Sequence, residues 1–336
     1  MMRRAARRGS RGPGAAWPAL LVLLVLCAGC GAEEPAPEPA EPAAETSVAD
    51  AEPEGFLPAL AAWKEKRDQR LREEDSWLTL VGLHWLEPGD SGCGTDEGLP
   101  VQFPAGTAAA RVGTFRVQED GVSLQVAPGV QVDAVSGESE RRALEPGAWH
   151  PIAADDAETP DRLFSGELQF YLIRREERVG IRVKHPGSPV RTGFEGLDYF
   201  PPSEDYRVEA EFVPFDPPKK VPIATVIGTE VEMQSPGEVR FSLGGESLTL
   251  EPLASAGGRL WFIFKDRTNG SETYGAGRYL YADAPVDGKV TVDFNRAYNM
   301  PCAFTEFATC PLPPRSNWLA VKVEAGEKAF KGGPAH

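Results

Sequence analysis

The feature that most constrains this fold is a long series of short strand patterns, each interrupted by turn residues. Between residues 76 and 330, runs of alternating apolar and polar residues are broken repeatedly by Gly, Pro, Asn or Asp. Alternation with a period of two places every second side chain on the same face of a β-strand. Breaks at Glu176-Glu177 and Gly244-Gly245 have the spacing of hairpin turns. We therefore predict an all-β fold, mainly an antiparallel sandwich or barrel, built from about a dozen short strands.

A single segment follows a helical period instead. Leu60, Trp63, Arg67 and Leu71 recur at helical spacing, with charged residues around them. This spacing predicts one N-terminal helix within residues 56–75, packed on the β structure. A helix that binds a partner protein is the alternative.

The amino terminus has the pattern of a targeting segment. Arginines precede a short apolar run at residues 17–28, which is much shorter than the ~20 apolar residues that a membrane-spanning helix needs. Residues 1–29 are therefore predicted to be a signal peptide. The run Leu26-Cys27-Ala28-Gly29-Cys30 is similar to a bacterial lipobox and predicts lipidation of Cys30. A soluble protein released by ordinary signal peptidase is the alternative.

Residues 30–55 form a tether rich in Pro, Glu and Ala. Such a composition cannot bury apolar area, and charge repulsion together with Pro stiffness keeps it extended. Together with a lipidated Cys30, the tether predicts a lipid-anchored protein of the bacterial cell envelope, facing the periplasm or the exterior. The membrane, reached through the lipid, is then its partner.

The rest of the chain is predicted to hold two β units. A small sandwich-like subdomain is expected at residues 76–160 and a larger β-barrel or sandwich domain at residues 161–330, with the boundary in the polar gap at residues 153–162. The formal net charge of the chain is −15, and a body with this excess of acid has no electrostatic footprint for nucleic acid. We therefore expect no nucleic-acid partner.

The polar residues best suited to a binding site gather between residues 261 and 318, among aromatic residues and glycines. If the strand that begins near Arg278 pairs with the next strand along the chain, Arg278 lies near Asp293 and Arg296. Arginines beside a carboxylate and amides suit a small polar or anionic ligand. The predicted ligand-binding residues are Tyr274, Arg278, Asp293, Asn295, Arg296 and Asn299. The alternative is that these side chains bind no ligand and only hold an irregular loop in place through hydrogen bonds.

A hydrolase-like enzyme that uses the same pocket is a second hypothesis. Asp293 or His84 would act as the base, and Arg296 with Arg278 would stabilise an oxyanion. His84 lies inside an apolar run, so a histidine satisfied within the core is the alternative. The chain has no Gly-x-Ser-x-Gly elbow, His-Glu-x-x-His helix, P-loop or dinucleotide fingerprint, and no cofactor is predicted. A third hypothesis is a structural or protein-interaction module, which requires an exposed apolar patch.

Two cysteines, Cys302 and Cys310, lie close together inside a Pro-rich segment. Outside the cytoplasm such a pair usually forms a disulfide, which closes a short loop and contributes ~2–3 kcal/mol. We therefore predict a disulfide, with buried free thiols and reactive or metal-bound thiols as alternatives. No other Cys or His lies near the pair in sequence, so no metal site is predicted. Cys93 remains as a small buried residue.

Several long motifs resemble one known family. LVGLHWLEPGD, TYGAGRYL and DFNRAYNMPCAFTEFATCPLPP are similar to the family named domain of unknown function 1684, and the resemblance covers residues 63–328. The resemblance implies no assigned activity, and its members include both lipoproteins and cytoplasmic proteins. This sequence departs from the family pattern at Met300, where the family motif resembles Asn-Pro-Pro-Cys. A weaker similarity of residues 85–104 to a forkhead-associated sandwich lacks the phosphate-binding Arg, since Gly92 stands in its place.

Overall fold

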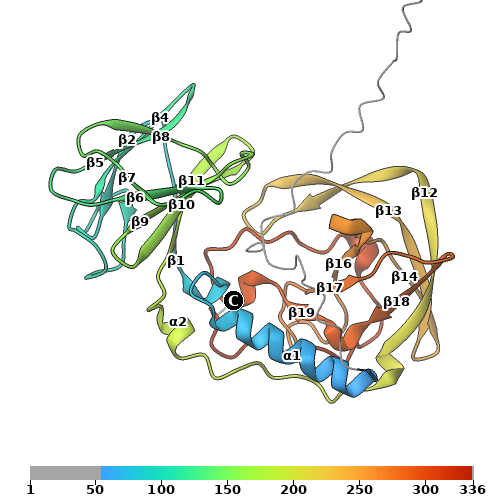
Figure 1. The fold of residues 1–336 in the computed structure, drawn as a ribbon. Coiled ribbons are helices and arrows are strands. Elements are labelled where there is room, and N and C mark those ends of the chain that lie inside the picture. The colour runs from blue at the N-terminus through green and yellow to red at the C-terminus, as the bar shows by residue number, and fades with distance from the viewer. Residues whose placement is uncertain (1–53, 335–336) are drawn as a thin grey trace, which may run out of the picture. The chain divides into compact units, whose positions relative to one another are not determined.

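The computed structural model describes residues 54–334. Strands dominate this range and form four open sheets, and α1 (Phe56–Arg72) is its long helix (Figure 1). The prediction of an all-β fold with one N-terminal helix is confirmed, although the strands close no barrel in the described range. The predicted signal peptide, the lipidated Cys30 and most of the tether lie outside the described residues. None of the helices between residues 54 and 334 has the length and apolar character needed to cross a membrane.

The first half of the described chain forms two sheets around a shared core. One sheet has the order β1-β11-β10-β9-β6-β7 and the other has the order β3-β2-β4-β5-β8. The strands are β1 (Leu80–Trp85), β2 (Gly89–Gly94), β3 (Val101–Gln102), β4 (Gly113–Gln118), β5 (Gly121–Val126), β6 (Asp133–Ser136), β7 (Arg142–Ala143), β8 (Trp149–Ile152), β9 (Asp161–Ser165), β10 (Leu168–Arg175) and β11 (Arg178–Lys184). Phe103, Phe115 and Phe170 pack at the centre of the core.

Strand pairing in this half crosses the boundary that was expected at residue 160. β9, β10 and β11 follow that position in sequence, yet β11 pairs with β1 and β9 pairs with β6. The predicted hairpin at Glu176-Glu177 is confirmed, because β10 and β11 pair up to Arg175 and Arg178. One sheet therefore extends from residue 80 to residue 184.

The second half forms the other two sheets. Their orders are β14-β13-β12-β18 and β15-β16-β17-β19. The strands are β12 (Arg207–Ala224), β13 (Glu230–Leu243), β14 (Glu246–Leu250), β15 (Leu253–Ala254), β16 (Leu260–Phe264), β17 (Arg278–Ala282), β18 (Lys289–Asp293) and β19 (Tyr298–Asn299). The predicted hairpin at Gly244-Gly245 is confirmed by the pairing of β13 with β14. Phe262, Phe264 and Phe294 lie in the core between the sheets.

Short helical turns connect these strands. They are α2 (Pro189–Thr192), η1 (Trp77–Thr79), η2 (Glu204–Tyr206), η3 (Ala256–Gly258), η4 (Phe294–Arg296), η5 (Pro301–Ala303) and η6 (Arg315–Asn317). Two of them, η4 and η5, follow β18 and hold much of the polar segment that the sequence marks as a candidate site.

Helix α1 packs on the second half of the chain through one face. Leu60 and Leu71 are buried, as their helical spacing predicts. Arg67 lies on the same face, and its Nε donates to Glu327 Oε1 at 2.9 Å while its Nη2 donates to the carbonyl oxygen of Asn299 at 3.2 Å. Figure 1 shows α1 running alongside β19, which carries that carbonyl. The helix is therefore joined to β19 by a hydrogen bond and to the C-terminal segment by a partly buried ion pair.

Candidate functional site

The prediction that the strand beginning at Arg278 pairs with the next strand along the chain is wrong. β17, which begins at Arg278, pairs with β16 and β19. β18 pairs instead with β12 in another sheet, where Asp293 lies opposite Arg207. The turn between β17 and β18 therefore connects two sheets rather than closing a hairpin, and Arg278 forms no ion pair with Asp293.

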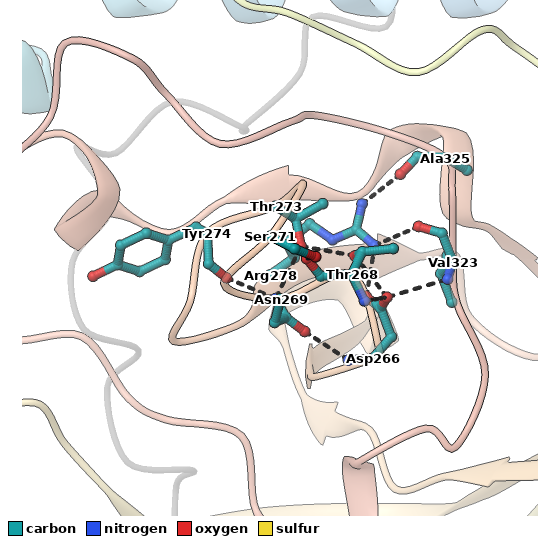
Figure 2. A network of polar contacts seen from close by, with 9 residues as sticks. All are labelled: Asp266, Thr268, Asn269, Ser271, Thr273, Tyr274, Arg278, Val323 and Ala325. Atoms are coloured by element: carbon teal, nitrogen blue, oxygen red, sulfur yellow. Dashed lines mark hydrogen bonds and ion pairs between the residues drawn. The ribbon is translucent and has the colours of Figure 1, made fainter. Parts of the chain in front are cut away.

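Arg278 is completely buried and its guanidinium is bound on two sides (Figure 2). Nη2 donates to Asp266 Oδ2 and to the carbonyl oxygen of Val323, both at 2.8 Å. Nη1 donates to the carbonyl oxygen of Ala325. Burial lowers the pKa of Arg278, and the charge of Asp266 opposes that effect. These contacts are typical of a structural ion pair that fixes the C-terminal segment to β17.

Polar groups in the loop before β17 form hydrogen bonds with one another. Asp266 Oδ1 accepts from the backbone N–H of Thr268 at 2.8 Å and from its hydroxyl at 2.6 Å. Asn269 bridges the loop, since its Oδ1 accepts from the Asp266 N–H and its Nδ2 donates to the carbonyl oxygen of Tyr274. Figure 2 shows this network and also shows the ring of Tyr274 turned away from Arg278. Tyr274 therefore does not share a binding surface with Arg278.

The other predicted ligand-binding residues hold loops together. Asp293 Oδ1 accepts from both the backbone N–H and the side-chain amide of Asn295, at 3.0 and 2.8 Å. The amide of Asn295 in turn binds the N–H and the carbonyl oxygen of Ser203. Arg296 Nε lies 3.7 Å from Asp293 Oδ2. These residues connect η4 to the segment before β12, as the structural alternative expects.

Asn299 is also buried within the chain. Its backbone N–H donates to Glu327 Oε2 at 2.7 Å and its Nδ2 donates to the carbonyl oxygen of Lys328 at 2.7 Å. It therefore belongs with the ion pair of Arg67 and Glu327 rather than with Arg278.

His84 lies in a different sheet from Asp293. It stands opposite Ile181 in the pairing of β1 with β11, and its Nε2 has no hydrogen-bond partner in the described chain. Burial lowers the pKa of His84, which favours the neutral imidazole. No hydrogen bond therefore joins His84 to Asp293, the two residues predicted as alternative bases.

A buried cation that the sequence reading missed lies on β11. The side chain of Arg182 is 3% exposed, and its Nη2 donates to Thr309 Oγ1 at 3.3 Å. This is the only hydrogen bond of that guanidinium between residues 54 and 334, and its Nε has no partner there. No carboxylate of the same range lies within ion-pair distance of Arg182. Apolar residues alternate with Arg182 along β11, so its sequence pattern does not distinguish burial from exposure.

A second arginine converges on the same hydroxyl. Arg175 Nε donates to Thr309 Oγ1 at 3.2 Å, but the charge of Arg175 is compensated by Asp155 Oδ2 at 2.8 Å from Nη1. Aromatic rings approach Arg182 as well, with the Trp77 centroid 5.7 Å and the Tyr171 centroid 6.0 Å from Cζ. Two guanidinium groups therefore meet at one neutral oxygen, and the described residues supply no counter-charge to that of Arg182.

Lys184 adds a further buried cation to β11. Because alternate side chains of a strand share a face, Lys184 lies on the same face as Arg182. Its Nζ donates to the backbone carbonyl oxygen of Asp75, so it is not neutralised by a carboxylate in the described part of the chain. This face of β11 therefore has an excess of positive charge.

The predicted disulfide is not found: Cys302 and Cys310 are both buried and are not joined by a disulfide bond. The sulfur of Cys310 instead accepts the backbone N–H of Cys302 at 3.1 Å. Hydrogen bonding with Cys310 lowers the pKa of Cys302, burial opposes this effect, and the charge of Arg182 lowers the pKa further. Burial raises the pKa of Cys310 well above the ordinary thiol value.

Tyr274 belongs with these thiols. Its pKa is raised, first by burial and then by electrostatic interaction with Cys302 and Cys310. We refer to Arg182, Thr309, Cys302 and Cys310 as the Arg182 cluster. The cluster combines a hydroxyl, two thiols and a cation that no carboxylate in residues 54–334 compensates. Among the described residues no group of three or more His, Cys, Asp or Glu side chains is arranged to hold a metal ion.

Comparisons with known proteins add a family but no activity. The family described as Protein of unknown function (DUF1684) matches residues 192–328. The chain is also similar to the solution NMR structure of an uncharacterized protein from Haloarcula marismortui, with 36% sequence identity over 41% of this chain and 78% of that chain, at a TM-score of 0.36. No curated protein matches the chain. The family match includes Thr309 and both thiols of the Arg182 cluster, whereas Arg182 precedes it.

Proposed function

We propose that this chain, which belongs to the DUF1684 family through residues 192–328, binds a small anionic ligand at the Arg182 cluster. The family has no assigned activity, so the proposal is argued from the side chains of this chain. A carboxylate or phosphate group is the expected anion. The proposal keeps the ligand class that the sequence indicates and moves the site from Arg278 to Arg182.

One observation carries this proposal: Arg182 is buried without a counter-charge in the described range. Transfer of a charged group out of water is unfavourable unless a partner and hydrogen bonds compensate it. A guanidinium has five N–H donors, and Arg182 uses one of them within the described chain. An anion with two acceptor oxygens would pair with the remaining donors in a bidentate geometry.

Thr309 suits the same ligand. Its oxygen accepts hydrogen bonds from both Arg175 and Arg182. A hydroxyl that accepts two hydrogen bonds still has its own proton to donate. An oxyanion beside Thr309 would therefore receive hydrogen bonds from the hydroxyl and from Arg182.

We propose further that the ligand-binding body is displayed in the cell envelope from a lipidated Cys30. The support is the lipobox-like run before Cys30 and the Pro/Glu/Ala composition of residues 30–55. Expression in a bacterium followed by detergent phase separation tests this anchor. The wild-type chain should enter the detergent phase, and Cys30→Ser should remain in the aqueous phase.

Thermal unfolding of the full chain in detergent solution tests anion binding. Phosphate and citrate, compared at constant ionic strength, should raise the Tm, because a ligand at 100 times its Kd stabilises the folded state by about 2.7 kcal/mol. Arg182→Met should abolish the shift. Arg116→Met is the matched control, since Arg116 is exposed and pairs with Asp90 on the same half of the chain. Equal shifts in the wild type and Arg182→Met would contradict the proposal.

A further inference from the structure

We propose that the ligand of the Arg182 cluster carries two separate anionic groups, one bound by Arg182 and the other by Lys184. This inference rests on the proposed anion binding and adds the class of ligand. Such a ligand is a small molecule with an anionic group at each end of a short chain, as in a dicarboxylate. The family match begins after both residues and assigns no ligand to either.

Lys184 is a second buried cation that no carboxylate compensates in the described chain. It is 6% exposed, and its Nζ donates to the backbone carbonyl oxygen of Asp75. The lysines that lie within ion-pair distance of a carboxylate between residues 54 and 334 are others. A single hydrogen bond to a neutral oxygen uses only part of the donor capacity of an ammonium group, and a buried charge is unfavourable unless it is compensated. Lys184 therefore favours an anionic partner for the same reason as Arg182.

Both cations lie on one face of β11, two residues apart. Alternate residues of a strand are roughly 7 Å apart along its axis and project from the same face. The ring centroid of Tyr171 is 6.0 Å from Arg182 Cζ and 5.9 Å from Lys184 Nζ, so both charged groups approach the same ring. Tyr171 is only partly buried, so solvent reaches a side chain beside both cations. One small molecule can therefore contact Arg182 and Lys184 together.

The neighbouring strands supply no counter-charge at either position. On β10, Tyr171 stands opposite Arg182 and Gln169 stands opposite Lys184. On β1, leucines stand opposite both cations. Residues that are directly opposite each other in adjacent strands are the nearest cross-strand neighbours on a sheet face. Because all of these neighbours are neutral, a compensating charge has to come from outside the sheet.

Arg175 shows a different solution on the same face. It lies on β10, and its Nη1 is 2.8 Å from Asp155 Oδ2, although Arg175 is less buried than Arg182. This face therefore does supply a carboxylate to a cation that serves the fold. The lack of one at both Arg182 and Lys184 favours two anionic groups that belong to a ligand.

Thermal unfolding of the full chain in detergent solution tests the inference, with each Kd obtained from the dependence of the Tm on ligand concentration at constant ionic strength. Glutarate is the dianionic probe, and pentanoate has the same number of carbon atoms with one carboxylate. The Kd of glutarate should be at least about tenfold lower, because a hydrogen bond to a charged group is worth more than the free energy that separates a tenfold difference in affinity. Succinate and butyrate repeat the comparison with a shorter chain.

Lys184→Met should weaken the binding of glutarate until it equals that of pentanoate. Lys289→Met is the matched control, since Lys289 is exposed and pairs with Glu209, and it should keep the preference for glutarate. The comparison of glutarate with pentanoate in the wild type needs no variant, so the test stands even if Lys184→Met fails to fold.

The outcomes separate this inference from the proposed function. Binding of both probes that depends on Arg182, without a preference for glutarate, would overturn the second anionic group and leave the proposed function intact. A preference for glutarate that survives in Lys184→Met would also overturn the inference, because another residue then binds the second carboxylate. A Tm that neither probe nor phosphate changes would overturn the inference and the proposed function together.

Discussion

Arg278 Nη2 and Asp266 Oδ2 form an ion pair at 2.8 Å in which both side chains are completely buried. The same guanidinium binds the carbonyl oxygens of Val323 and Ala325, and the same carboxylate binds Thr268. An arginine that the sequence marks for ligand binding is therefore part of the framework that holds three segments together.

Removal of one partner from this pair should be strongly destabilising. Asp266→Asn or Arg278→Met is expected to lower the free energy of unfolding by about 3–5 kcal/mol, because the remaining charge is left buried and unpaired. Urea unfolding followed by tryptophan fluorescence measures the change. Arg240→Met is the control, since Arg240 pairs with Glu238 at the surface and its loss should have little effect. A normal midpoint for Arg278→Met with loss of anion binding would instead favour the ligand-binding role.

The ion pair of Arg67 and Glu327 should determine whether α1 stays docked. Glu327 is completely buried and binds both Arg67 and the N–H of Asn299. Glu327→Ala should therefore cost about 2–4 kcal/mol and increase amide hydrogen exchange along α1. Gln69→Ala is the control, because it removes an exposed hydrogen bond to Glu65 on the same helix and should leave exchange in α1 nearly unchanged. Equal exchange in the two variants would show that apolar contacts alone hold the helix.

Two glycines with the same backbone conformation should respond differently to alanine. Gly326 has φ of 78°, and a Cβ there would lie 2.3 Å from the carbonyl oxygen of Ala297. Gly228 has φ of 79°, and a Cβ there would meet nothing within 4 Å. Both substitutions cost about 1–2 kcal/mol for the left-handed conformation, and Gly326→Ala should cost more because of the added clash. Equal urea midpoints for the two variants would contradict the close approach at Gly326.

The buried thiol of Cys93 should make stability fall at alkaline pH. Burial raises its pKa in the folded protein to about 12, from an ordinary value of 9.0. Above about pH 9 the unfolded chain loses this proton while the folded chain keeps it, so the free energy of unfolding decreases by at most ~1.4 kcal/mol per pH unit. Stability is unaffected by this group below about pH 9, where both states are protonated.

Cys93→Ala isolates that effect. The variant should be less stable at neutral pH because it leaves a small cavity. Its free energy of unfolding should nevertheless fall less steeply between about pH 9 and 11 than that of the wild type. Parallel curves for the two proteins would mean that Cys93 ionises as easily in the folded state as in the unfolded one.

The class of fold was predictable because it depends on local periodicity. Helical spacing places Leu60 and Leu71 on one face of α1, and both are buried there. Alternation and turn residues likewise predict the strands and the hairpins at Glu176-Glu177 and Gly244-Gly245. Each of these features is determined by residues that are close together in the chain.

The pairing of β17 was not predictable in this way. A strand pattern defines which residues share a face but does not identify the neighbouring strand. β18 follows β17 after a short turn, yet its buried Val290 and Val292 belong to a strand that pairs with β12. The ion-pair partner of Arg278 depends on that pairing, so the sequence suggested Asp293 where the structure has Asp266.

The Arg182 cluster was missed for a related reason. Arg182 alternates with Ile181 and Val183, as a surface cation on a half-buried strand does. Its burial depends on Thr309, which lies 127 residues further along the chain. The cysteine spacing did direct attention to Cys302 and Cys310, but the same spacing fits a disulfide and a pair of free thiols equally well.

The C-terminal segment has a consequence for biosynthesis. Val323, Ala325 and Glu327 supply partners to Arg278 and Arg67, and the ion pair of Arg67 with Glu327 spans 260 residues. A ribosome adds these partners after both arginines, so a nascent chain that ends before residue 323 leaves Arg67 without Glu327 and Arg278 without the carbonyl oxygens of Val323 and Ala325. The second half of the protein should therefore reach its native state only after residue 327 has been added, and chains that terminate before residue 323 should be recognised as unfolded by proteases.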